Sequence, residues 1–245
     1  MTTSLVDLTV STQPIPESVA ADWTPGTMRF QLAPAVSDYL LAHSHGYGAA
    51  GRALVQATAS LGEPAVMMIA PEQYGFLRLM ASMLNARRAL DLGTFTGLSA
   101  MALAEGVGEH GAVVTVDRNQ AWIELARPYW RAAGIEGRVQ VRVGEIADVL
   151  AALPMDEPFD IVFIDADKAN AEHYVEQALL RLSPHGIVVL DNVLWHGWVM
   201  EESRQDEDTR GMRRCNVSLV RHPGLEVTML PLADGLSIIR RTTGT

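Results

Sequence analysis

Two apolar segments, FDIVFID at residues 159–165 and GIVVLDN at residues 186–192, decide the fold of this chain. Each is rich in β-branched and aromatic residues, and apolar runs of this length without polar alternation are typical of buried strands in a parallel sheet. Each run also ends in oxygen-bearing side chains, Asp165 in the first and the pair Asp191 and Asn192 in the second. Because open α/β sheets bind ligands at the carboxyl ends of their strands, this pattern predicts a site there.

The three polar residues at these strand ends suit a hard divalent cation. Carboxylate and amide oxygens are the ligands that magnesium, calcium and manganese prefer, whereas zinc and copper favour nitrogen and sulfur. We therefore expect Asp165, Asp191 and Asn192 to hold a metal, with Mg²⁺ first and Ca²⁺ or Mn²⁺ as alternatives. The competing interpretation is that the same residues are ordinary turn and capping residues after two strands.

Outward from these segments, short apolar runs alternate with stretches that have apolar residues at helical spacing. The predicted strands cover residues 88–93, 112–117, 139–143, 159–165 and 186–192, and the predicted helices cover 36–44, 49–61, 72–84, 97–105, 119–134, 146–153 and 169–182. The tail differs, because LEVTML (225–230) and LSIIRR (236–241) are joined by a turn at Asp234 and Gly235. The pattern predicts an α/β fold with a mostly parallel sheet, helices on both faces and an antiparallel C-terminal hairpin.

Composition and charge narrow the class of protein. The chain has 245 residues, of which 48% are hydrophobic and 20% charged, so residues 31–245 are expected to form a single domain. Residues 1–30 are rich in Ser, Thr and Pro and are interpreted as an irregular N-terminal arm or lid. A net charge of −10 and the lack of a basic stripe argue against a nucleic-acid partner.

The cellular setting is inferred from cysteine use and hydropathy. Cys215 is the only cysteine, so the chain cannot form an intrachain disulfide, and a reducing, cytoplasmic location is expected. The first residues lack the basic start of a signal peptide, and no apolar run is long enough to span a bilayer, so no membrane partner is expected.

The loop DLGTFTGLS at residues 91–99 follows the first strand of the alternating pattern. Gly93 and Gly97 allow a tight turn beside a bound ligand, but the middle glycine of the dinucleotide-binding fingerprint is missing. Asp91 would repel a pyrophosphate and attract the sulfonium and ammonium groups of S-adenosylmethionine. Asp117 ends the second strand, where a carboxylate can accept the ribose hydroxyls. Taken singly, each aspartate is equally well explained as a turn or capping residue.

At this point the chain resembles the cation-dependent class I S-adenosylmethionine O-methyltransferases, which include the caffeoyl-CoA and catechol O-methyltransferases. The resemblance runs from about Met67 to the end and rests on six segments: MIAPEQYGFL (68–77), DLGTFTGLS (91–99), TVDRN (115–119), FDIVFIDADKAN (159–170), VVLDNVLWHG (188–197) and LPLADGLSIIRR (230–241). It implies a Rossmann-like, seven-stranded, mostly parallel sheet with a reversed final hairpin, and a homodimer.

The resemblance also implies roles for individual residues. The metal ligands are Asp165, Asp191 and Asn192; the cofactor contacts are Ile69, Asp91, Gly93, Thr94, Ser99, Asp117, Ile146, Asp165 and Asp167; and the catalytic residues are Lys168 and Asp165. Two positions depart from the family pattern, since Asp91 stands where many members have Glu and His196 stands where Asn is common. The second departure concerns the side of the site that faces the acceptor.

Several side chains have both a functional and an ordinary structural interpretation. Lys168 is either the base beside the acceptor oxygen or a solvated lysine at a helix start, and if charged it would instead stabilise a phenolate. His196 and Trp198 are candidates for the acceptor site, with structural roles as the alternative. Met67, Met68 and Tyr74 are candidate pocket residues, although the core is the expected place for the methionines. Trp122 and Trp130 are expected in the core. The acidic run 201–208 is expected to form a solvated loop, with a lid over the acceptor as the alternative.

The function predicted from these observations is methyl transfer from S-adenosylmethionine to a hydroxyl of a small, catechol-like aromatic, with a divalent cation holding two neighbouring oxygens. Biosynthesis of natural products is the expected setting. A second hypothesis keeps the cofactor but uses a nitrogen or carbon acceptor without the metal. A third, from another class, is a nucleotide-binding module without catalysis.

Overall fold

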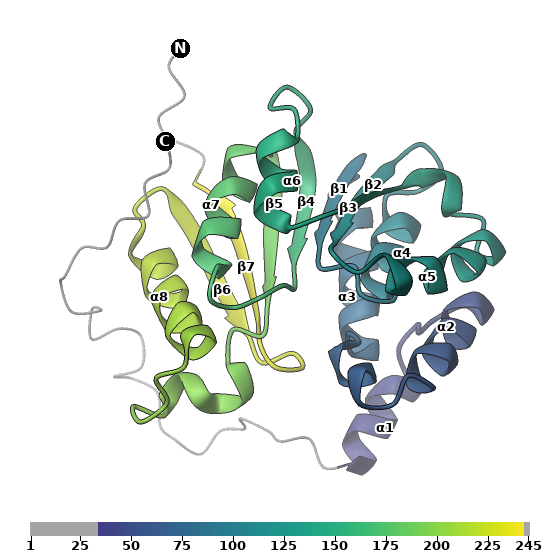
Figure 1. Ribbon diagram of the computed structural model, residues 1–245, viewed down its shortest axis with the longest axis horizontal. Coiled ribbons are helices and arrows are strands. Elements are labelled where there is room, and N and C mark those ends of the chain that lie inside the picture. The colour runs from purple at the N-terminus through teal and green to yellow at the C-terminus, as the bar shows by residue number, and fades with distance from the viewer. Residues whose placement is uncertain (1–33, 243–245) are drawn as a thin grey trace.

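The computed structural model describes residues 34–242, in which seven strands form one sheet flanked by helices (Figure 1). The strands are β1 (Arg88–Leu92), β2 (Ala112–Asp117), β3 (Val139–Val143), β4 (Phe159–Ile164), β5 (Leu182–Asp191), β6 (Leu225–Leu230) and β7 (Leu236–Arg241). The helices are α1 (Pro34–Ala42), α2 (Ala49–Ala59), α3 (Pro71–Met83), α4 (Leu98–Gly106), α5 (Gln120–Ala132), α6 (Ile146–Ala152), α7 (Ala171–Leu180) and α8 (Glu207–Arg221), with the 3-10 helices η1 (Glu63–Met67), η2 (Glu136–Arg138) and η3 (Trp195–Met200). The arm predicted at residues 1–30 lies outside the described residues.

The sheet has the strand order β3-β2-β1-β4-β5-β7-β6. Strands β1 to β5 pair in parallel, whereas β7 runs antiparallel to both β5 and β6. The predicted α/β fold with a reversed final hairpin is therefore confirmed. Because β1, β4 and β5 are neighbours at the centre, the residues that follow them meet at one edge of the sheet.

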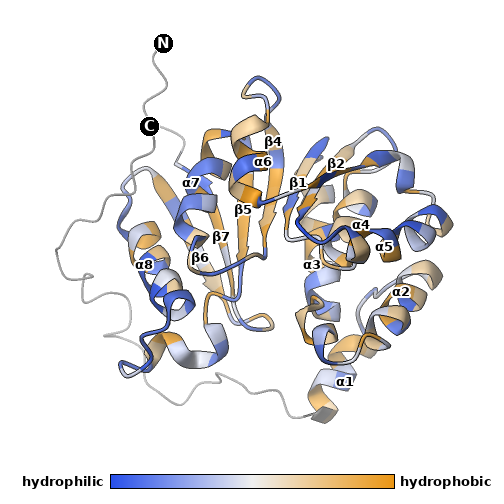
Figure 2. Cartoon of the chain, viewed as in Figure 1, coloured by the Kyte–Doolittle hydropathy of each residue, from blue (hydrophilic) through white to orange (hydrophobic). Residues whose placement is uncertain are grey.

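Two hydrophobic cores lie on opposite faces of the sheet, and residues of each central strand alternate between them. Ile161 and Phe163 of β4 pack with α2, α3, α4 and α5, while Val162 and Ile164 pack with α6, α7 and α8. Figure 2 shows the central strands as hydrophobic along their length, with polar residues on the outer faces of the helices. This burial on both faces explains why the strand sequences show no polar alternation.

Helix α8 is the main element that the sequence analysis did not predict. The acidic run 201–208, expected to be a loop throughout, contains the N-cap of α8, Asp206, whose side chain accepts hydrogen bonds from the backbone N–H and the hydroxyl of Thr209. The helix then buries Met212, Cys215 and Leu219 at three- and four-residue spacing in the second core. The predicted loop was wrong from Glu207 onward, because the charged outer face of α8 obscures its narrow apolar stripe.

The first turns of α8 contact the backbone that follows β4. Asp208 accepts hydrogen bonds from the N–H groups of Lys168 (3.1 Å) and Ala169 (2.9 Å). At Gly211 a Cβ atom would lie 2.4 Å from the carbonyl oxygen of Lys168 and 2.6 Å from Cα of Ala169. The close approach of α8 to this segment therefore requires glycine at position 211.

Replacing Gly211 by Ala should lower the free energy of unfolding by about 1–3 kcal/mol, because the added methyl group forces α8 away from residues 168 and 169. Gly137→Ala is the matched control, since a Cβ there meets no atom within 4 Å, and it should be neutral or slightly stabilising. Urea unfolding of both variants measures the difference. Equal stabilities of the two variants would contradict the close packing of α8.

Candidate functional site

The ends of β1 and β4 approach each other closely at the carboxyl edge of the sheet. Gly93, directly after β1, has φ of +103°, and a Cβ there would lie 1.9 Å from the carbonyl oxygen of Asp165. The N–H of Asp165 donates to the carbonyl of Leu92 over 2.8 Å. Only glycine meets both the steric and the conformational requirement at position 93, so this residue sets how near the loop after β1 lies to Asp165.

Two carboxylates and one ammonium group meet where β4 and β5 end. Lys168 Nζ lies 2.9 Å from Asp165 Oδ1, and Lys168 is only 5% exposed, so the interpretation of Lys168 as a solvated lysine is wrong. Asp191, 2% exposed, accepts a 2.6 Å hydrogen bond from the N–H of Asn192. Burial, together with the negative charge of Asp165, raises the pKa of Asp191 to about 7, although Lys168 opposes this shift.

These residues fit a hard cation by their chemistry. The Asp191 carboxylate is buried and is repelled by that of Asp165, and both effects raise its pKa, so a bound cation would favour its charged form. Within residues 34–242 no three His, Cys, Asp or Glu side chains are grouped so that they could hold a metal ion. A cation bound here would therefore take its third protein ligand from an amide, as the Asn192 side chain beside Asp191 can provide.

The loop after β1 lines a pocket at the same edge. The pocket is lined by Met67, Met68, Ile69, Gly93, Thr94, Phe95, Thr96, Leu98, Ser99 and Asp165. Five residues expected to contact the cofactor, Ile69, Gly93, Thr94, Ser99 and Asp165, thus come together around one cavity. The methionines line it as well, which corrects their expected place in the core.

Asp117, at the end of β2, is tied to this loop. One of its oxygens accepts the N–H of Phe95 over 2.7 Å, and the other accepts the N–H of Asn119 over 2.8 Å. The ring of Phe95 meets Trp122 edge-on, with centroids 5.0 Å apart. Asp117 is 9% exposed and retains free lone pairs, so its carboxylate can accept further hydrogen bonds from a ligand beside the loop.

Asp91 is fully buried in β1 beneath the pocket. Its Oδ2 accepts a 2.6 Å hydrogen bond from Thr115 Oγ1, which in turn lies 2.6 Å from Thr94 Oγ1. Its Oδ1 is buried and has no hydrogen-bond partner within the described part of the chain. Burial raises the pKa of Asp91 to about 7, although the hydrogen bond from Thr115 and the nearby hydroxyl of Ser99 oppose the shift. A positively charged ligand in the pocket would offset the free-energy cost of burying the Asp91 carboxylate.

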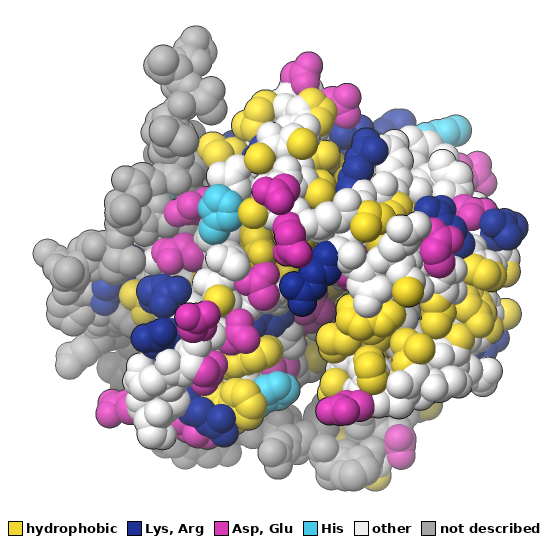
Figure 3. All heavy atoms as spheres, viewed as in Figure 1, with side chains coloured by type: hydrophobic (Ala, Val, Ile, Leu, Met, Phe, Trp, Pro, Cys, Tyr) yellow, Lys and Arg dark blue, Asp and Glu magenta, His cyan; other side chains and the backbone are white. Residues whose placement is uncertain are grey.

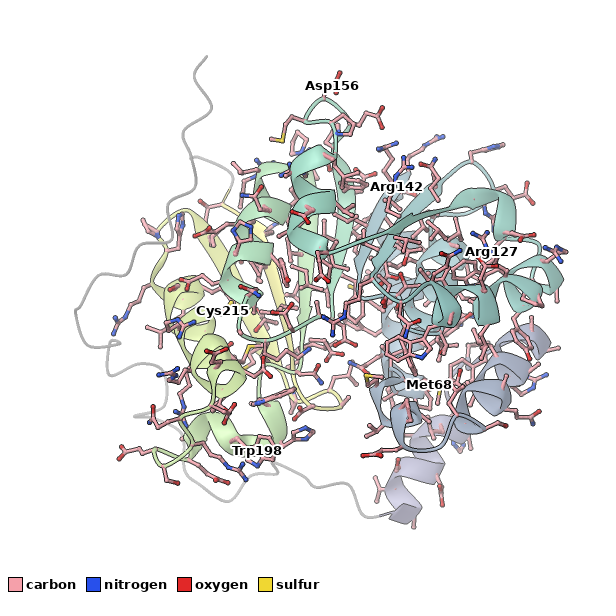
Figure 4. The ribbon with its side chains drawn as sticks, viewed as in Figure 1. Met68, Arg127, Arg142, Asp156, Trp198 and Cys215 are labelled. Atoms are coloured by element: carbon pink, nitrogen blue, oxygen red, sulfur yellow. The ribbon has the colours of Figure 1, made fainter. Side chains whose placement is uncertain are left out.

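The segment after β5 gathers three aromatic rings beside Lys168. Lys168 Nζ lies 5.7 Å from the ring centroid of Trp195, and the Trp195 and Trp198 rings meet edge-on at 6.0 Å. His196 is exposed, and its backbone N–H donates to Asp234 over 2.8 Å. Figure 4 shows Trp198 near the amino end of α8, with Met68 across the lower edge of the sheet. Through Lys168, which pairs with Asp165, the aromatic candidates are therefore linked to the carboxylates at the ends of β4 and β5.

Three further candidates lie away from this arrangement. Asp167 is exposed, and its carboxylate accepts hydrogen bonds from Asn170 and from Tyr174 Oη (2.6 Å), so it is held against the start of α7. Ile146 begins α6 and packs against the second core. Tyr74 is fully buried against Tyr47, so its suggested place in the pocket is not observed.

Phe95, Thr115 and Gln73 are contributors that the sequence analysis missed. Gln73 accepts the N–H of Ala70 over 2.7 Å, and its amide lowers the pKa of Asp191. Thr115 faces Asp91 because the two residues are register partners of β2 and β1. That pairing could have been inferred from the alternating strand pattern, whereas nothing in the sequence connects Gln73 with Asp191.

Comparison with known proteins gives a consistent family. A family model described as O-methyltransferase matches residues 45–242. The probable caffeoyl-CoA O-methyltransferase 1 of Dictyostelium discoideum is 30% identical over 218 residues, which cover 87% of this chain and 95% of that protein. The catechol O-methyltransferase of Mycobacterium tuberculosis is 40% identical over 163 residues, or 66% of this chain and 73% of that protein.

Solved structures agree in fold. The O-methyltransferase TomG from Streptomyces achromogenes, in complex with SAM, has a TM-score of 0.79 at 29% identity, covering 85% of this chain and 96% of that one. An O-methyltransferase from Bacillus cereus, in complex with SAH, has a TM-score of 0.77 at 30% identity, covering 85% and 97%.

The buried Asp91 carboxylate makes stability depend on pH in the absence of ligand. Because its pKa is raised above the unfolded value, its contribution to stability is complete below about pH 4 and is lost as the pH rises towards 7. Asp91→Asn should therefore gain stability relative to wild type as pH rises from 5 to 8, by at most about 1.4 kcal/mol per pH unit. Urea unfolding at several pH values measures this difference, and a pH-independent difference would contradict the shift.

Proposed function

The chain belongs to the O-methyltransferase family, and we propose that it is a divalent-cation-dependent enzyme that methylates one of two neighbouring hydroxyls on a small, catechol-like aromatic. Family membership makes it an S-adenosylmethionine-dependent O-methyltransferase of the caffeoyl-CoA and catechol type. The cation and the acceptor are the proposed part. The observation that carries them is the meeting of Asp165 and Asp191 beside Lys168 and an aromatic cluster.

The cofactor is proposed to occupy the pocket after β1. There, Asp91 faces the methionine part with a buried carboxylate, and Asp117 accepts the ribose hydroxyls. A cationic ligand suits the unpartnered Oδ1 of Asp91, because opposite charge lowers the cost of its burial. Phe95 and Trp122 provide an apolar boundary on the Asp117 side.

The acceptor is proposed to bind where β4 and β5 end. Asp165, Asp191 and Asn192 would hold a divalent cation, with Mg²⁺ as the first choice, whose charge favours the deprotonated form of a phenol bound to it. Methyl transfer then forms a bond from the acceptor oxygen to the methyl carbon as the carbon–sulfur bond breaks. The chain's own contribution is to hold the two reactants in line.

Lys168 is proposed to act on the acceptor oxygen electrostatically. Its Nζ pairs with Asp165 over 2.9 Å, and its position is restrained by Asp208 through the backbone and by the Trp195 ring. A buried ammonium group next to a developing phenolate stabilises negative charge on oxygen, and the hydroxyl proton passes to solvent. Asp165 holds Lys168 in this orientation.

Other features of the enzyme remain predictions from the sequence: the homodimer, the cytoplasmic location and a role in natural-product biosynthesis. Acidic and basic side chains are mixed across the face drawn in Figure 3, with no continuous basic stripe on that face. None of the helices within residues 34–242 is long and apolar enough to cross a membrane.

The hypotheses of a nitrogen or carbon acceptor and of a non-catalytic module are not adopted, because the family transfers methyl groups to oxygen.

Metal removal tests the cation. Purified enzyme with S-adenosylmethionine and magnesium should methylate catechol, and treatment with a chelator should lower turnover by about a hundredfold or more, because charge stabilisation worth several kcal/mol is lost. Added magnesium should restore it. Resorcinol, whose hydroxyls are not neighbours, is the matched acceptor and should react poorly. Undiminished turnover after chelation would refute the cation, and equal rates for the two phenols would refute chelation of the acceptor.

A pair of substitutions tests the division of roles. Asp191→Asn should reduce turnover by about a hundredfold or more while leaving the Kd of S-adenosylmethionine within about threefold, because it disturbs only the acceptor side. Asp117→Asn should raise that Kd by about tenfold, because charge-assisted hydrogen bonds are weakened. Calorimetry and initial rates measure both quantities. Loss of cofactor binding in Asp191→Asn would show that the two halves of the site are not separate.

A further inference from the structure

Polar side chains of α8 hold the backbone of each segment that flanks the proposed acceptor side. Asp208 accepts the N–H groups after β4, at Lys168 and Ala169. Asn216 donates to the carbonyl of Val193, just after β5, over 2.8 Å. Arg213 lies between them on the helix and makes the largest set of contacts. Helix α8 is therefore in a position to shape this half of the site.

Arg213 binds a run of backbone carbonyls in residues 198–204. Its Nε donates to Val199 over 2.9 Å, and its two terminal nitrogens donate to Trp198 over 2.8 Å and to Arg204 over 2.7 Å, with a further hydrogen bond to Glu201. An arginine presents its N–H donors in a rigid planar fork, so one side chain can hold several carbonyls in a fixed arrangement. No lysine can reproduce this geometry.

Few other contacts hold residues 198–204 in place. The segment is not part of the sheet, and its residues Glu201 to Arg204 are exposed. Val199 packs against the second core, and turns within the segment join Glu201 to Trp198 and Arg204 to Glu201. These turns fix its internal shape but not its place on the protein. Its place therefore depends on Val199, on the ring contacts of Trp198 and on Arg213, which holds the carbonyls of four of its residues.

Residues 198–204, which Arg213 holds, contact the aromatic cluster beside Lys168. The ring of Trp198 lies 6.0 Å from that of Trp195 and 4.9 Å from that of His196, and its other neighbour is the guanidinium of Arg204 at 4.1 Å. Trp195 in turn lies below Lys168 Nζ. A displacement of residues 198–204 would thus move a wall of the acceptor side.

We propose that Arg213 is a positioning residue that sets acceptor binding and specificity by holding Trp198 and residues 199–204 in place. The inference rests on the proposed function above, since it presumes an acceptor beside Lys168. Loss of the hydrogen bonds from Arg213 to this segment should weaken acceptor binding and reduce discrimination between acceptors of different size. The affinity for S-adenosylmethionine should not change, because no residue that lines the proposed cofactor pocket belongs to α8 or to residues 198–204.

The experiment compares Arg213→Gln and Arg213→Lys with Arg210→Gln, a control that removes an exposed arginine from the same helix. Three quantities are measured: KM and kcat for catechol and for a bulkier catechol, the Kd of S-adenosylmethionine, and the rate of tryptic cleavage after Arg204. For Arg213→Gln we expect the catechol KM to rise by about tenfold, the cofactor Kd to stay within about twofold, and cleavage to accelerate. Arg213→Lys should lie between this variant and wild type, and the control should match wild type.

Two outcomes would overturn the proposal. Faster cleavage with an unchanged acceptor KM would show that Arg213 holds residues 198–204 without affecting acceptor binding. A parallel rise in acceptor KM and cofactor Kd, with a lower melting temperature, would show a general loss of structure; if Arg213→Gln does not fold, Arg213→Lys decides by the same criteria. A wild-type enzyme that methylates no catechol refutes the proposed function, and the cleavage rates then still decide whether Arg213 holds the segment.

Discussion

Buried negative charge at the carboxyl edge of the sheet is the constraint on which the rest of the structure depends. Asp91 and Asp191 are both out of contact with solvent, and the pKa of each is raised to about 7 by burial and by the charge of Asp165. Burying an isolated carboxylate costs folding free energy, and a nearby positive charge offsets that cost. Lys168 supplies part of this charge through its ion pair with Asp165. The negative charge that Lys168 does not balance explains why a sulfonium cofactor and a divalent cation would suit this edge.

The backbone brings these charges together at close range. Gly93 lets the loop after β1 approach Asp165, and the parallel pairing of β1, β4 and β5 places their ends side by side. Both faces of these strands are buried, so the edge cannot move without disturbing two cores. A rigid sheet therefore holds the proposed cofactor pocket and the carboxylates at a fixed separation, as in-line transfer between two bound reactants requires.

The parts of the fold that could be predicted are those with a local periodic signal. Continuous apolar runs predicted β4 and β5, and the turn at Asp234 and Gly235 predicted the reversed hairpin. Helix α8 was missed because its apolar stripe is narrow and its first turn is acidic. The burial of Lys168 was also unpredictable, because it results from contacts with Asp208, forty residues away, and with Trp195.

The same distinction separates the two halves of the candidate site. The proposed cofactor half is built from strand register, as in the pairing of Asp91 with Thr115, so a motif along the chain can predict its place. The acceptor half is built from side chains of α8 and the β6–β7 hairpin that hold loop backbone, as Arg213 and Asp234 do. Such contacts leave no periodic trace in the sequence. Acceptor preference can therefore change through substitutions in α8 while the cofactor motif stays the same, so a shared motif identifies the methyl donor far better than the molecule that receives the methyl group.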